Sequence, residues 1–179
     1  QEITSYTGQA MILSLPNILT YGRILAVPVV TGCILWRGDN ARWLALLVFI
    51  VAALTDFLDG YLARRWKQQS SLGRMLDPIA DKLLVAATLL ALAGDNTIYG
   101  IHTWAGVIII CREVLVSGLR EFLAELRVSV PVTQLAKKKT GLQLVAVAFL
   151  IAGPAGDKLF SYTTWIGLAG LWIAAALTL

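Results

Sequence analysis

The chain has 179 residues, of which 58% are hydrophobic and 15% are charged, and its formal net charge is +4. A soluble domain is typically about 45–50% apolar and about 25% charged, so this composition argues against an ordinary soluble domain and favours an integral membrane protein. The basic residues fall at the ends of apolar runs, which argues against nucleic-acid binding and favours topology signals and anion ligands. At about 20 residues per span, the length accommodates roughly six membrane-spanning helices.

In chain order, residues 1–15 are mildly apolar but short, and we expect them to lie on the membrane surface as an interfacial segment. We expect residues 16–179 to form one all-α integral membrane domain with six transmembrane helices. The expected spans cover residues 17–36, 43–63, 73–93, 104–127, 140–152 and 159–179. Between them we expect basic loops at residues 64–72 and 128–139 and a turn at residues 153–156.

Lys and Arg residues are distributed unequally between the two sides of these spans. One side collects Arg64, Arg65, Lys67, Arg74, Arg127, Lys137, Lys138 and Lys139, whereas the other collects Arg37, Arg42 and Lys158. Because Lys and Arg mark the cytoplasmic side, both basic loops and both termini are predicted to face the cytoplasm.

Four aspartates lie where the second span ends and the third begins, namely Asp56, Asp59, Asp77 and Asp81. At about 100° per residue, each pair shares one helix face, and the reversing loop brings both faces to one membrane depth. Four ionised carboxylates repel one another unless some are protonated or cations lie among them. Carboxylate oxygens favour Mg²⁺ or Mn²⁺, and two such ions are typical of phosphoryl transfer. A solvated loop with chance acidic residues would explain one isolated pair, but it explains two helical pairs poorly.

The same stretch contains residues suited to a diphosphate. Gly60 and Gly73 allow a ligand to approach the backbone closely. The guanidinium of Arg64 can bind phosphate oxygens in bidentate fashion.

The pattern Asp-x2-Asp-Gly-x2-Ala-Arg-x8-Gly-x3-Asp-x3-Asp resembles the signature of the CDP-alcohol phosphotransferases. This resemblance implies a six-helix membrane enzyme, usually a homodimer, that transfers a substituted phosphate from a CDP-linked donor to an alcohol and releases CMP. It implies that Asp56, Asp59 and Asp77 bind two divalent ions and that Asp81 is the general base, while also touching a metal. The CDP pocket it implies is formed by Asp59, Gly60, Ala63, Arg64 and Gly73, and Asn17 and Thr20 either join it or cap the first helix.

Four further motifs resemble one branch of this family, the bacterial phosphatidylglycerophosphate synthases. They are Pro16-Asn17-x2-Thr20-x2-Arg23, Leu76-Asp77-Pro78-x-Ala80-Asp81-Lys82, Arg112-Glu113-x6-Arg120-Glu121-x3-Glu125-Leu126 and Lys137-x-Lys139-Thr140. That branch implies CDP-diacylglycerol as the donor and glycerol 3-phosphate as the acceptor. One departure is Ala136, where the branch has glycine.

Glycerol 3-phosphate is a small dianion, so its site needs fixed positive charge. Arg112 and Arg120 are eight residues apart, about 80° around a helix, so one broad face can carry both. The remaining candidates on that side are Lys137, Lys139 and Arg74. Supporting roles are expected for Arg23, as the partner of a carboxylate or the orienter of a metal ligand, and for Glu113, as a partner of Arg112 or Arg120. For the lysine run, topology and attraction to anionic lipid are the alternative explanation.

The signature by itself leaves other activities open. Cardiolipin, phosphatidylinositol phosphate and phosphatidylserine synthases share it, so only the later motifs favour glycerol 3-phosphate. An aspartate-rich membrane prenyltransferase would normally carry two such motifs, and this chain has one cluster. A non-enzymatic membrane protein would have its charges spread along a pathway.

Overall fold

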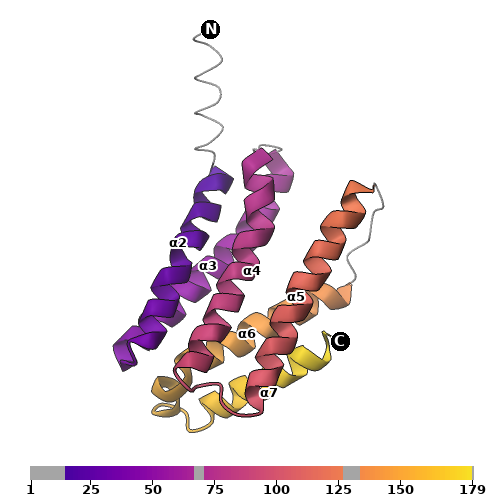
Figure 1. The fold of residues 1–179 in the computed structure, drawn as a ribbon. Coiled ribbons are helices and arrows are strands. Elements are labelled where there is room, and N and C mark those ends of the chain that lie inside the picture. Colours follow the sequence, from indigo (N-terminus) through magenta and orange to yellow (C-terminus); the bar gives the residue numbers. More distant parts are fainter. Residues whose placement is uncertain (1–14, 67–70, 127–133, 179) are drawn as a thin grey trace.

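A computed structural model describes residues 15–66, 71–126 and 134–178, and within these ranges the chain forms six helices and no strand (Figure 1). The all-helical architecture is therefore confirmed over the described residues. The helices are α2 (Leu15–Leu35), α3 (Asp39–Trp66), α4 (Ser71–Gly94), α5 (His102–Glu125), α6 (Gln134–Asp157) and α7 (Thr163–Ala176). The interfacial segment expected at the N-terminus lies outside the described residues, except that Leu15 already opens α2.

The membrane spans are less uniform than the sequence predicted. Among the described residues, one segment, 139–157, is both long enough and apolar enough to cross a membrane. Three shorter apolar stretches accompany it, at residues 19–35, 82–94 and 163–176. The helices themselves are long, with 28 residues in α3 and 24 in α5, but both carry charged side chains toward one end. A six-span insertion thus stays a prediction.

The connections define two ends of the bundle. In Figure 1 the α2–α3, α4–α5 and α6–α7 connections lie at the lower end, whereas the start of α2, the end of α3, the start of α4 and the end of α5 lie at the upper end. Helix α2 packs against both α3 and α4, α6 packs against α3, α4 and α7, and α5 contacts α4 and α7. We call the upper end the aspartate end, because the last turns of α3 and the first turns of α4 carry the four aspartates.

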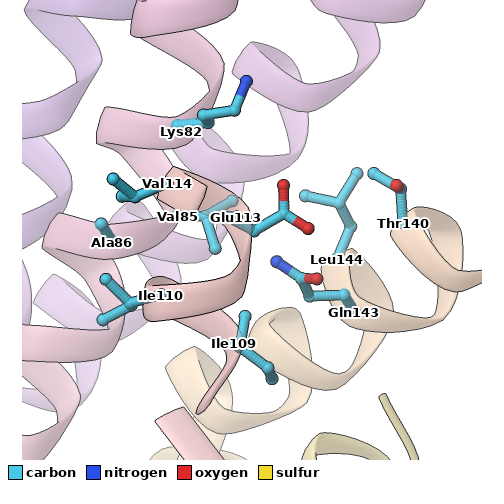
Figure 2. A pocket seen from close by; sticks show the side chains of 10 residues that line it. All are labelled: Lys82, Val85, Ala86, Ile109, Ile110, Glu113, Val114, Thr140, Gln143 and Leu144. Atoms are coloured by element: carbon cyan, nitrogen blue, oxygen red, sulfur yellow. The ribbon is translucent and has the colours of Figure 1, made fainter. Parts of the chain in front are cut away.

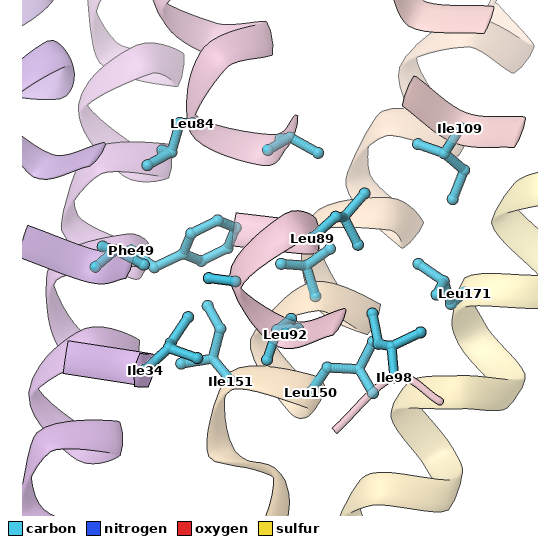
Figure 3. Close-up of a cluster of buried hydrophobic side chains, with 14 of the residues drawn as sticks. Ile34, Phe49, Leu84, Leu89, Leu92, Ile98, Ile109, Leu150, Ile151 and Leu171 are labelled. Carbon is cyan, nitrogen blue, oxygen red and sulfur yellow. The ribbon is translucent and has the colours of Figure 1, made fainter. Parts of the chain in front are cut away.

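A single apolar core connects the six helices. Ile34, Phe49, Leu92, Ile109 and Leu171 are each at most 1% exposed, and they come from α2, α3, α4, α5 and α7. Figure 3 shows these side chains meeting Leu150 and Ile151 of α6 in the middle of the bundle. The core holds the helix ends in register, and so it fixes which residues converge at the aspartate end.

Glycines allow α6 and α7 to approach closely. A Cβ added at Gly167 would lie 2.8 Å from Cγ of Leu150, and one at Gly170 would lie 3.0 Å from Cβ of Ala146. Real Cβ atoms do not tolerate the first of these distances without movement, so small residues at this interface allow close helix packing. The two glycines are thus used inside the subunit, which accounts for them without a dimer contact.

The turn expected at residues 153–156 corresponds to a sharp kink in α6 at Gly153, and helical residues follow the kink to Asp157. Helix α7 begins at Thr163 rather than near residue 159. Gly153 has φ +38°, a left-handed conformation that glycine adopts without steric cost. Pro154 has no N–H, so it cannot donate to the carbonyl of Leu150 as an ordinary helical residue would. The regular helix is therefore interrupted at Gly153, as the sequence predicted.

Arg42 of α3 supplies the missing donor. Its Nη1 donates to the carbonyl oxygens of Leu150 (3.4 Å) and Ile151 (3.1 Å). Its Nη2 donates to Oγ1 of Thr97 at 2.7 Å and to the carboxylate of Asp95, with which it forms an ion pair. The sequence predicted only a topology signal at Arg42, whereas the side chain is buried and joins α3, α6 and the α4–α5 connection.

Candidate active site

The aspartates lie on helices rather than on a loop. Asp56 and Asp59 belong to the last three turns of α3, and Asp77 and Asp81 belong to the first three turns of α4. The backbone of both helices is described, and the reversing connection places these turns at the same end of the bundle (Figure 1). The side chains of the four aspartates lie outside the described part of the structure, so their grouping around metals stays a prediction.

The other signature residues share this position. Gly60, Ala63 and Arg64 lie on α3, and Gly73 and Arg74 lie on α4. The connection between the two helices is therefore shorter than the basic loop predicted at residues 64–72. Helix α3 continues to Trp66, and α4 begins at Ser71. As with the aspartates, nothing beyond the helical backbone of these residues is described.

Helix α2 brings two polar side chains into the interior. Thr20 is 1% exposed and Arg23 is 2% exposed, and they are one turn apart on the same face. Because α2 packs against α3 and α4, these residues face the two helices that carry the aspartates. A buried guanidinium is costly unless it is paired, so its position supports a role at the site. Asn17 lies in the first turn of α2, and its side chain is outside the described part.

A charged cluster joins α5 to α6. The Oε1 atom of Glu113 lies 3.1 Å from Nζ of Lys139 and 3.2 Å from Nη1 of Arg112. The Lys139 side chain is only 3% exposed, whereas those of Arg112 and Glu113 are 29% and 26% exposed. Arg120 lies on α5 about two turns beyond Arg112, and its side chain is exposed. The structure therefore brings together two of the predicted phosphate ligands, Arg112 and Lys139, and the predicted supporting carboxylate.

The lysine run was wrongly predicted to lie on a loop. Helix α6 begins at Gln134, so Lys137, Lys138 and Lys139 all lie in its first two turns. Helical geometry separates neighbouring residues by about 100°, so these three side chains cannot all face the same way. Lys139 points into the protein, and the side chains of Lys137 and Lys138 lie outside the described part.

A pocket lies beside this cluster, between α4, α5 and α6. Its polar lining comes from three helices, with Lys82 on α4, Glu113 on α5, and Thr140 and Gln143 on α6. Figure 2 shows Glu113 and Gln143 extending toward each other, whereas the ammonium of Lys82 points away from them. Its apolar walls are formed by Val85, Ala86, Ile109, Ile110, Val114 and Leu144. Lys82 directly follows Asp81, so this pocket opens next to the helix turn that carries the predicted base.

Gln143 is the residue that sequence reasoning missed. It is 3% exposed, and its Oε1 atom is buried without a hydrogen-bond partner among the described residues. Its spacing from Lys139 could have identified it, because Gln143 lies four residues later and therefore on the same face of the helix. An amide on an apolar helix gives no chemical signal until the neighbouring helices are known.

The donor set fits divalent cations. The aspartate end offers four carboxylates on two adjoining helix ends, and the sequence between Asp56 and Asp81 contains no His or Cys. Oxygen ligands of this kind suit Mg²⁺ or Mn²⁺ rather than zinc. A pocket lined by Lys82, and the charged cluster of Arg112, Glu113 and Lys139, lie beside it, so the two ends of the site together suit a reaction between two phosphate-bearing substrates.

The fold is a helical bundle with four aspartates at one end, an arrangement typical of enzymes that act on phosphate compounds. The family model for CDP-alcohol phosphatidyltransferases matches residues 13–179, and the chain belongs to that family.

Relatives with assigned activities agree with this membership. A protein of Rickettsia bellii is 46% identical over 93% of this chain and 90% of its own length, and one of Cereibacter sphaeroides is 43% identical over 92% and 90%. A protein of Shigella flexneri is 37% identical over 94% of this chain and 91% of its own. All three are named CDP-diacylglycerol–glycerol-3-phosphate 3-phosphatidyltransferase.

Proposed function

We propose that this protein transfers the phosphatidyl group of CDP-diacylglycerol to the 1-hydroxyl of sn-glycerol 3-phosphate, giving phosphatidylglycerol phosphate and CMP. The names and the high coverage of the relatives support this reaction. The observation that carries the proposal is the charged cluster of Arg112, Glu113 and Lys139. It adjoins the pocket between α4, α5 and α6, which Lys82 and Glu113 line next to the turn of Asp81. Such a site suits an acceptor that bears a phosphate as well as a hydroxyl.

The donor is assigned to the aspartate end. Asp59, Gly60, Ala63, Arg64 and Gly73 would bind the cytidine diphosphate. Thr20 and Asn17 of α2 are further candidates, and Arg23 would pair with a carboxylate of the site. Asp56, Asp59, Asp77 and Asp81 would hold two divalent cations, Mg²⁺ or Mn²⁺, which when bound neutralise the charge of the diphosphate.

The acceptor is assigned to the basic pocket. Its phosphate would bind Arg112, Arg120 and Lys139, with Lys137 and Arg74 as additional ligands. Glu113 fixes the positions of Arg112 and Lys139, because one of its oxygens contacts both cations. Asp81 would then accept the proton of the 1-hydroxyl. The resulting oxygen attacks the phosphorus that bears diacylglycerol, and CMP departs with the electrons of the broken bond. Catalysis would depend mainly on positioning and on neutralised charge.

The surface of the bundle supports a membrane location. Large apolar side chains lie on the outside as well as the inside, including Leu25, Leu47, Leu90 and Leu119, each more than half exposed. Helices that are apolar all round occur in large cores or in membranes. We therefore propose a multi-pass protein of the bacterial inner membrane whose aspartate end faces the cytoplasm, with a homodimer as the assembly.

Related acceptors define the main competing activities. Cardiolipin, phosphatidylinositol phosphate and phosphatidylserine synthases would require phosphatidylglycerol, inositol phosphate or serine in the same pocket. The cations of the charged cluster, Arg112 and Lys139, favour an acceptor that bears a phosphate over serine, and the names of the relatives favour glycerol 3-phosphate.

One assay tests the proposal. Purified protein with CDP-diacylglycerol and Mg²⁺ or Mn²⁺ is offered each acceptor separately, and CMP release is measured. We expect release with glycerol 3-phosphate, and release only with a different alcohol would contradict the acceptor assignment. Asp81→Asn should abolish turnover, because the amide cannot accept the proton. Substantial activity in that variant would exclude Asp81 as the base.

A further inference from the structure

The amide oxygen of Gln143 is a buried hydrogen-bond acceptor that has no donor among the described residues. The residue is 3% exposed and lines the pocket between α4, α5 and α6, yet its Oε1 has no partner among the described residues. Leaving such a group buried and unpaired costs about 1–3 kcal/mol. Buried polar side-chain atoms in folded proteins are mostly paired, so a molecule that enters the pocket is the expected donor.

The surroundings of Gln143 specify what that donor is. Thr140 lies one turn before Gln143 on α6, and Glu113 faces the amide from α5 (Figure 2). Lys139, also one turn earlier on α6, pairs with this same Glu113. The cations in this cluster suit a phosphate, whereas an amide oxygen accepts only from O–H or N–H. The ligand therefore needs an anionic end and, a short distance away, a neutral group that donates a hydrogen bond.

We propose that Oε1 of Gln143 accepts a hydrogen bond from the middle hydroxyl of a three-carbon phosphate acceptor and so selects for that hydroxyl. This inference rests on the proposed function, which assigns the phosphate of the acceptor to the basic residues and its terminal hydroxyl to Asp81. The middle hydroxyl is then the one remaining donor on the molecule. A site that pairs with a hydroxyl rejects an analogue lacking it, because its own polar group is then left buried and unpaired.

The experiment compares two acceptors in the intact enzyme. These are sn-glycerol 3-phosphate and 3-hydroxypropyl phosphate, which keeps the phosphate and the terminal hydroxyl but lacks the middle one. CMP release gives kcat/KM for each. We expect the unaltered enzyme to prefer glycerol 3-phosphate by about tenfold or more, since that is the factor that one buried hydrogen bond provides. An unaltered enzyme that uses both acceptors equally well would overturn the inference.

Variants assign the preference to Gln143. Gln143→Met keeps the length of the side chain and removes the amide, so kcat/KM for glycerol 3-phosphate should fall about tenfold while that for 3-hydroxypropyl phosphate stays the same. The control variant Leu144→Met also introduces methionine into the wall of this pocket, but it leaves the amide in place. It should therefore keep the preference for glycerol 3-phosphate. Equal losses with both acceptors in Gln143→Met would mean that the amide serves packing or binds only water, and would contradict the inference.

Two further outcomes are distinguishable. If the unaltered enzyme releases no CMP with glycerol 3-phosphate, the proposed function itself fails, and the inference fails with it. If Gln143→Met does not elute as folded protein in size-exclusion chromatography, Gln143→Asn takes its place. That variant withdraws the amide by one methylene and is expected to lose the preference in the same way.

Discussion

Arg42 is predicted to be a main determinant of stability at the end of the bundle opposite the aspartates. Its guanidinium is paired with the buried carboxylate of Asp95 and donates to Thr97 and to two carbonyl oxygens of α6. In the variant Arg42→Met, the Asp95 side chain, which is only 1% exposed, would remain charged without its partner. Removing one member of a buried ion pair costs about 3–5 kcal/mol.

This cost corresponds to a large shift in thermal stability. For a chain of this length, about 1 kcal/mol lowers Tm by roughly 2–4 °C, so we expect Arg42→Met to lower Tm by roughly 6–20 °C. The measurement is tryptophan fluorescence of the detergent-solubilised protein during heating. At temperatures where the variant is folded, KM for both substrates should be unchanged, because the cluster lies at the far end of the bundle from the aspartates.

Two further variants make the reasoning testable. Asp95→Asn combined with Arg42→Met should recover part of the loss, because no buried charge is then left unpaired. Lys158→Met removes an ion pair with Asp39 at the same end, but the Lys158 side chain is 66% exposed, so the cost should stay below about 1 kcal/mol. Equal losses in Arg42→Met and Lys158→Met would refute the distinction between buried and exposed pairs on which the prediction rests.

The remaining predictions concern helix packing and the site. Gly167→Ala should destabilise the protein by about 1–3 kcal/mol, because its Cβ would collide with Leu150, whereas Gly141→Ala in open space should be neutral or stabilising; equal Tm values would contradict this. Lys139→Met should raise KM for glycerol 3-phosphate about tenfold or more, whereas Lys138→Ala should change it little, and steady-state kinetics would show the reverse if the assignment is wrong. EDTA should abolish CMP release and added Mg²⁺ or Mn²⁺ should restore it; activity that survives chelation would exclude a role for divalent cations.

Much of the fold follows from local sequence patterns. Apolar runs separated by polar breaks predicted six helices in the correct order, because a long apolar segment forms a helix whatever its partners are. Helix ends were harder to predict. The run at residues 137–139 is polar and basic and reads as a loop, yet the backbone there is already helical, since Lys has a high helix propensity.

The glycine-proline pair at residues 153 and 154 shows a different limit. It predicts a turn, and it would break an isolated helix. In the folded protein the chain does bend at Gly153, and a further helical segment follows to Asp157. Arg42 binds two carbonyl groups beside the kink. Residue 42 is more than 100 positions away, and no local pattern contains that contact.

The sequence by itself predicted a divalent-cation site at the aspartate end from residue type and spacing along two helices, and its family resemblance implied the separate roles of Asp56, Asp59, Asp77 and Asp81. Only the tertiary structure decided that Arg112, Glu113 and Lys139 form one cluster and that Gln143 lines the pocket beside it. Lys139, Glu113 and Gln143 meet because α4, α5 and α6 pack around one space. Helix spacing fixes which side chains share a face, but contacts between helices depend on the packing of the whole core.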